Sequence, residues 1–89
     1  ILFMNINELI AIVKKKLETD IIIEKISIED KTFLHKNHPG HQENKYHLKL
    51  NIHSKQLKEL DKIESSKKIY KILDQEIKSY IHSIQISIY

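Results

Sequence analysis

Six histidines and no cysteine are the features of this 89-residue sequence that bear most directly on chemistry. Imidazole nitrogens are good ligands for zinc, copper and iron. The absence of thiols excludes disulfides, and it excludes any metal site that uses thiolates of this chain. Metal binding would therefore depend on imidazole, and each histidine needs its own interpretation.

Three of the histidines, His35, His38 and His41, are spaced by three residues in a stretch that has no hydrophobic period. No acidic or thiol ligand accompanies them in a recognisable pattern, so their spacing alone does not predict a self-contained metal site. His82 stands where a helical period changes to a strand period, which gives its side chain a fixed backbone beneath it. Its position is the only feature that distinguishes it.

The remaining pair, His47 and His53, alternates with Lys49 and Asn51 in a stretch with strand period. We interpret these positions as the solvent face of a sheet. A platform for nucleic acid on that face would be expected to carry aromatic rings on which bases stack, and none of these positions carries Phe, Tyr or Trp.

Catalytic patterns are missing. The chain has no cysteine nucleophile, no glycine-rich phosphate loop and no Gly-x-Ser-x-Gly turn. We therefore expect no enzyme. The net charge of +3 is weak evidence for nucleic-acid binding, because lysines are interspersed with acidic residues.

The elements that must position the histidines follow from hydrophobic period. Residues 6–19 predict a helix, with Asn5 as the N-cap and Glu8 as the partner in a capping box. Its apolar face comprises Ile6, Ile10, Val13 and Leu17, and a lysine run at 14–16 suits the negative end of the helix dipole.

Residues 21–28 predict a strand, residues 29–44 a long loop, and residues 46–53 a second strand. Ser54 is expected to cap a short helix that contains Leu57 and Leu60. Ser65 or Ser66 is expected to cap the last helix, whose apolar face comprises Ile69, Ile72, Leu73, Ile77 and Tyr80. Alternating Ile84, Ile86 and Ile88 predict the final strand.

This order predicts one α+β domain over residues 1–89, with an open sheet in one layer, helices in the other, and the last strand parallel to an earlier one. We expect residues 1–4 to be a flexible N-terminal extension. No run is long enough for a secretion signal or a membrane span, so the expected location is cytoplasmic.

Several short motifs, in this order, resemble the BolA family. Ile69-Tyr70, Leu73, Glu76 and Ile81-His82-Ser83-Ile84 resemble its hydrophobic-Tyr pair and its Val-His-Ala-Leu at the start of the last strand. Upstream, Asp30 and Thr32 resemble its Asp-x-Ser, and Tyr46-His47-Leu48 resembles its Thr-His-Phe. The resemblance extends from about residue 7 to the C-terminus.

The resemblance implies a class II KH-like αββααβ fold with a three-stranded mixed sheet. It also implies a non-enzymatic adaptor that binds a monothiol glutaredoxin, with glutathione, and shares a [2Fe–2S] cluster with it. In that arrangement His82 is one ligand, and His35, His38 or His41 is the second. The isolated chain is expected to hold no cluster, because its own thiolates are absent.

Two departures from the family pattern bear on a rival function. Ser65-Ser66-Lys67 replaces the family's Arg-His-Arg, and Glu59 replaces a glycine. The alternative is a DNA-binding transcriptional regulator of BolA type, with Lys67, Lys68 and Lys71 contacting phosphates. Besides the glutaredoxin, a weak homodimer is an expected partner state, and no membrane partner is expected.

Overall fold

The computed structural model describes residues 4–32 and 45–89. The elements follow the order α1 (Ile6–Asp20), β1 (Lys25–Asp30), β2 (Tyr46–His53), α2 (Lys55–Lys58), α3 (Lys62–Ile72), α4 (Asp74–Ser79) and β3 (Ile81–Ile88). The expected αββααβ order is confirmed, with the last helix divided into α3 and α4.

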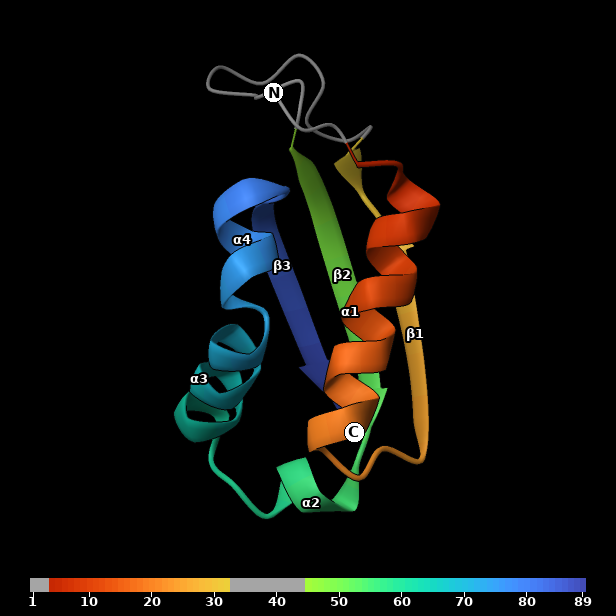
Figure 1. The fold of residues 1–89 in the computed structure, drawn as a ribbon. Helices are drawn as coiled ribbons and strands as arrows, with labels where there is room; N and C mark the ends of the chain where they lie inside the picture. Colours follow the sequence, from red (N-terminus) through yellow and green to blue (C-terminus); the bar gives the residue numbers. More distant parts are fainter. Residues whose placement is uncertain (1–3, 33–44) are drawn as a thin grey trace.

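The sheet is mixed and has the order β1-β2-β3. β1 and β2 pair antiparallel, and β2 and β3 pair parallel, as expected for two strands that helices separate. The helices cover one face of the sheet (Figure 1). Leu48, Leu50 and Ile52 of β2 are buried in the same core cluster as Leu9, Val13 and Leu17 of α1. The opposite face of the sheet has no helix over it among the described residues, so the two-layer prediction is confirmed.

Helix α1 begins where the sequence predicts. The side chain of Asn5 accepts a hydrogen bond from the N–H of Asn7, but the return bond from Glu8 is absent from this described segment. The fully buried face includes Leu9, Val13 and Leu17, whereas the predicted Ile6 and Ile10 are only half-buried.

One lysine of the predicted run has a specific role. The Nζ atom of Lys16 lies 2.7 Å from a carboxylate oxygen of Glu76 on α4, and Glu76 is buried. The expected interaction of the lysine run with the helix dipole is wrong, because α1 extends to Asp20 and its last turn contains no basic residue. Lys16 instead ties α1 to the helix that leads into β3.

The first strand begins four residues later than predicted. Ile21 is buried, but its N–H closes the last turn of α1 on the carbonyl of Leu17. The N–H of Ile22 bonds to the side chain of Gln56 instead of to a neighbouring strand. Glu29 and Asp30, which were predicted to open the loop, belong to β1 and pair with β2.

The cap of the last helical segment is Asp61, not Ser65 or Ser66. Asp61 accepts a hydrogen bond from the N–H of Glu64, and the Glu64 side chain accepts one from the N–H of Asp61, which completes a capping box. Ser65 instead lies buried inside α3, where its hydroxyl donates to a backbone carbonyl. The turn at Leu73 then separates α3 from α4.

Ser54 caps α2 as predicted, with its hydroxyl oxygen accepting the N–H of Leu57. None of the helices in the described ranges has the length and apolar composition that crossing a bilayer requires.

Candidate metal-ligand site

His82 lies in a β-bulge at the start of β3. Tyr46 pairs with Ile81, but the next residue of β2, His47, pairs with Ser83. One extra residue of β3 therefore stands opposite the step between Tyr46 and His47, and that residue is His82. A bulge interrupts the alternation of side chains. Ile81 is consequently buried while both His82 and Ser83 are exposed.

The bulge brings two imidazoles together. The ring centroids of His47 and His82 are 4.9 Å apart, with the ring planes tilted by 56°. The Nδ1 atom of His47 lies 2.7 Å from the hydroxyl oxygen of Ser83, which is a hydrogen-bond distance. His47 is 5% exposed, so the prediction that it faces solvent is wrong. Two of its neighbours are Ser83 and His82 of β3.

His53 occupies the other end of β2, where it pairs with Lys25 of β1. Its ring stacks on that of Tyr89 with centroids 5.1 Å apart. It is half-buried, so the predicted solvent-facing position holds only in part. His53 is thus remote along the strand from the bulge, and it cannot join His82 in one small site.

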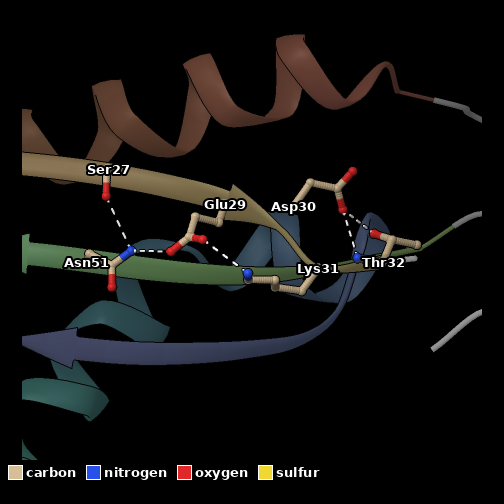
Figure 2. Close-up of polar contacts among 6 residues, drawn as sticks. All are labelled: Ser27, Glu29, Asp30, Lys31, Thr32 and Asn51. Atoms are coloured by element: carbon tan, nitrogen blue, oxygen red, sulfur yellow. Dashed lines mark hydrogen bonds and ion pairs between the residues drawn. The ribbon is translucent and has the colours of Figure 1, made fainter. Parts of the chain in front are cut away.

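A hydrogen-bonded turn fixes the chain that leaves β1 beside the bulge. The carboxylate of Asp30 accepts bonds from both the N–H and the hydroxyl of Thr32, and the Thr32 oxygen accepts the N–H of His47 at 3.1 Å. The N–H of Lys31 donates to the carbonyl of His47 at 2.7 Å. Figure 2 shows the bonds between Asp30 and Thr32. Because Thr32 also accepts the N–H of His47, this turn attaches the beginning of the loop to the residue whose ring lies next to that of His82.

The other end of the loop enters β2 at the same end of the sheet, where β2 begins. The N–H of Tyr46 donates to the carbonyl of Tyr80 at 2.9 Å, and its hydroxyl donates to the carbonyl of Met4 at 2.7 Å. Burial raises the pKa of the Tyr46 phenol, and the charge of Asp30 raises it further. Both described ends of the loop thus adjoin the bulge. The candidate ligands His35, His38 and His41 lie outside the described residues.

The uncovered face of the sheet carries a polar network. The amide nitrogen of Asn51 donates to Glu29 at 2.7 Å and to Ser27 at 3.2 Å, and Lys31 lies 3.1 Å from Glu29 (Figure 2). The hydrogen bond from Asn51, then the bond and charge of Lys31, hold the pKa of Glu29 below its ordinary value. These side chains bind one another and include no aromatic ring, which does not favour base stacking on this face.

Within residues 4–32 and 45–89, no group of three or more histidine, aspartate or glutamate side chains is arranged to hold a metal ion. His82 is an exposed imidazole on a rigid strand and can supply one ligand. The remaining ligands of any metal centre at the bulge must come from the loop or from another molecule. The described residues therefore do not complete a metal centre by themselves.

The alternative site residues lie on α3. Lys67 and Lys71 are exposed and Lys68 is half-buried. They are on a helix, whereas His82 is on β3, so the two candidate sites can be tested separately.

The proximity of His47 to His82 escaped the sequence analysis, although a signal for it exists. Ile81 and Ile84 are three residues apart in a strand whose other isoleucines are two apart. Since both side chains belong to the helix-covered side, one extra residue must lie between them, and a bulge is the usual way to accommodate it.

Comparisons with known proteins agree with this fold. A model of the BolA-like protein family matches residues 17–89. The BolA domain of SufE1 from Arabidopsis thaliana is similar with a TM-score of 0.77 and 22% identity, over 96% of this chain and 92% of that chain. BolA1 from Arabidopsis thaliana has a TM-score of 0.73 and 20% identity, over 89% of this chain and 87% of that chain. No curated protein matches the sequence. The family match includes both the bulge and the strand that carries His82.

Proposed function

Because the chain belongs to the BolA-like protein family, we propose that it is a non-enzymatic adaptor in iron–sulfur cluster handling. In this proposal it binds a monothiol glutaredoxin and supplies imidazole ligands to a [2Fe–2S] cluster that the two proteins share. His82 is the first ligand, and one of His35, His38 and His41 is the second.

The geometry around the bulge supports this role. His82 is exposed, and the residues on either side of it, Ile81 and Ser83, pair with β2 and so hold the bulge in place. The ring of His47 lies against it on one side, which restricts its rotamers without burying it. The segment that carries the three loop histidines begins at Thr32 and returns at Lys45, beside the same bulge. A loop ligand therefore has its attachment points near His82.

The chemistry of the donor set also supports a shared centre. This chain contains no cysteine, and iron–sulfur clusters require thiolates, so a partner must bring them. A glutaredoxin cysteine and glutathione are thiolates of the required kind. When bound, a [2Fe–2S] centre with imidazole ligands supplies a carrier of iron, sulfide and an electron at a higher potential than an all-thiolate centre.

The observation that carries the proposal is the exposed imidazole of His82 at a bulge to which both ends of the loop attach. The test is to mix the protein with a monothiol glutaredoxin and glutathione, reconstitute the cluster, and compare visible circular dichroism and the rate of cluster loss. His82→Ala should change the spectrum and release the cluster faster than wild type.

His53→Ala is the matched control, since it removes an imidazole from the other end of β2. It should leave both spectrum and rate unchanged. Replacing His35, His38 and His41 one at a time identifies the second ligand as the variant that behaves like His82→Ala. Equal spectra and equal cluster loss for His82→Ala and wild type would remove His82 from the role.

The regulator alternative predicts nucleic-acid affinity that falls steeply with salt and depends on Lys67, Lys68 and Lys71. The exposed positions of Lys67 and Lys71 are compatible with phosphate contacts. However, the only glycine of the chain is Gly40, so the Gly-x-x-Gly loop by which KH domains grip nucleic acid is missing. Absence of binding to DNA or RNA at low salt would dispose of this alternative.

A further inference from the structure

The two outer edges of the sheet differ in how they are protected. Strand β1 carries Lys25, Glu29 and Asp30, and charged residues on an edge strand discourage pairing with another chain. Strand β3 contains no lysine, arginine, aspartate or glutamate in its eight residues, and it contains no proline. Only β2 pairs with it in the described part of the chain. The β3 edge is therefore open to a further strand.

The direction of the β3 backbone groups follows from its bonds to β2. The N–H of Tyr89 donates to the carbonyl of Ile52, and the carbonyl of Tyr89 accepts the N–H of Ser54. In a parallel pair, alternate residues of a strand bond to the same neighbour. Gln85 and Ser87 therefore face β2, whereas the N–H and C=O groups of Ile84, Ile86 and Ile88 face outward.

The same three isoleucines line a groove. Two adjoining hollows between β3 and α3 share Lys62, Ser66, Ile86 and Ser87. One hollow extends along β3 to Ile84 and the other to Ile88. All three isoleucine side chains are only half-buried, in contrast to the fully buried Leu50 and Ile52 of β2. Outward backbone groups and incompletely covered apolar side chains thus lie along one edge.

The charge around this groove has one sign. Its described lining includes Lys49, Lys58 and Lys62 and no aspartate or glutamate. A ligand with carboxylates would complement the rim. Two copies of this chain that paired through β3 would instead bring two lysine rims together, which like-charge repulsion disfavours.

We propose that the groove between β3 and α3 binds an extended peptide segment of a partner protein, with alternating apolar and acidic residues, which adds to β3 as a fourth strand. The outward groups of Ile84, Ile86 and Ile88 bond to the peptide backbone. Alternate apolar side chains of the peptide cover the half-buried isoleucines, and its carboxylates lie on the opposite face of the added strand, on the side of Gln85 and Ser87, where one hollow also contains Lys49 and Lys62. This mode of recognition is strand addition at an open sheet edge. It uses residues outside the bulge and does not depend on the iron–sulfur role.

The test uses a capped peptide of alternating valine and glutamate, as long as β3, and follows backbone amides by NMR. Binding should protect the amide protons of Ile84, Ile86 and Ile88 from exchange with solvent. Those of Gln85 and Ser87 should change little, because β2 already bonds them. A valine and lysine peptide of equal length is the control and should not bind.

Two N-methylated versions of the peptide test the backbone bonds directly. One carries methyl groups on the valine nitrogens and the other on the glutamate nitrogens, so each blocks one edge of the extended peptide. One version should bind at least about tenfold more weakly than the parent, since each backbone bond contributes about 0.5–1.5 kcal/mol, and the other should bind normally. Equal affinity for both would overturn strand addition.

Charge-reversal variants test the site on the protein. Lys62→Glu should weaken binding by about threefold or more, in the range that exposed ion pairs provide. Lys25→Glu makes the same charge change on the opposite edge strand and should leave the affinity unaltered. Failure of the valine and glutamate peptide to bind, protection confined to other strands, or self-association through β3 would each overturn the proposal.

Discussion

Replacing Lys16 by methionine should destabilise the protein by about 1–2 kcal/mol. Lys16→Met keeps the length of the side chain but removes the cation that lies 2.7 Å from Glu76. Breaking a fully buried ion pair costs about 3–5 kcal/mol, because a charge is left buried and uncompensated. An exposed pair contributes only about 0.2–1 kcal/mol.

The exposed fractions of the Lys16 and Glu76 side chains place the energy of this ion pair between the values for a fully buried pair and for an exposed pair. The Glu76 side chain is 8% exposed and that of Lys16 is 36% exposed, so solvent screens one partner and a discount from the buried value is required. A loss of about 1–2 kcal/mol corresponds to a fall in Tm of roughly 5–15 °C for a domain of this size. Urea and thermal unfolding followed by circular dichroism measure both quantities.

Two matched variants isolate the buried carboxylate. Lys14→Met removes an exposed lysine from the same helix and should change stability by less than about 0.5 kcal/mol. Glu76→Gln removes the buried charge while leaving Lys16 free to reach water, so it should cost less than Lys16→Met. If Lys16→Met were no more harmful than Lys14→Met, the inference that this pair holds α4 against α1 would be refuted.

Three further predictions follow from single contacts. Asp61→Ala should lower the free energy of unfolding by about 1 kcal/mol in urea denaturation, and Asp61→Asn, which can still cap, should lose less; equal losses would contradict the capping role. Asn51→Ala should raise the pKa of Glu29 toward its ordinary value in an NMR titration. Because the pKa of Glu29 is lower in the folded state, Glu29 stabilises the protein above its unfolded pKa, and this stabilisation is lost as the pH falls through the folded pKa. In Asn51→Ala the stabilisation should be lost at a higher pH than in wild type. An unchanged pKa of Glu29 in the variant would contradict the hydrogen bond from Asn51. Tyr46 should ionise above the ordinary pKa of a tyrosine in an alkaline NMR titration, because burial and the charge of Asp30 raise its pKa, and a pKa at or below the ordinary value would contradict its burial.

Periodic patterns predicted the elements whose apolar faces are continuous. Alternation from Tyr46 to His53 defined β2, and the helical period of Ile69 and Leu73 defined the buried face of the last helical segment. The two patterns predicted these elements correctly because the burial of one apolar face dominates the stability of a half-exposed helix or strand. The parallel pairing of β3 followed from the intervening helices.

Local competition explains what the sequence analysis missed. Two serines and an aspartate all stand near the start of α3, but only Asp61 has a glutamate three residues later that closes a capping box. Ile21, Ile22 and Ile23 have strong strand propensity, yet they lie in the connection between α1 and the sheet. The capping box at Asp61 is itself a local signal that the sequence analysis overlooked, whereas in the segment after α1 the tertiary course of the chain overrode strand propensity.

The burial of His47 depended on contacts between distant residues. Its neighbours Ser83 and His82 are more than thirty positions away, and the bulge determines which of them it touches. Alternation along β2 alone places His47 with Lys49 on the polar side, and cannot show that β3 covers it. The contact between His47 and His82 therefore emerged only when the register between β2 and β3 was known.

The most direct test of the central claim is to ask whether a nitrogen of this chain binds iron. The protein is labelled with 15N-histidine, combined with an unlabelled monothiol glutaredoxin and glutathione, and loaded with the cluster, which is then reduced and studied by pulsed electron paramagnetic resonance. We predict strong 15N hyperfine coupling in wild type and in His53→Ala, and loss of the His82 contribution in His82→Ala. No coupling to labelled nitrogen in the wild-type complex would contradict the proposal that His82 is a ligand.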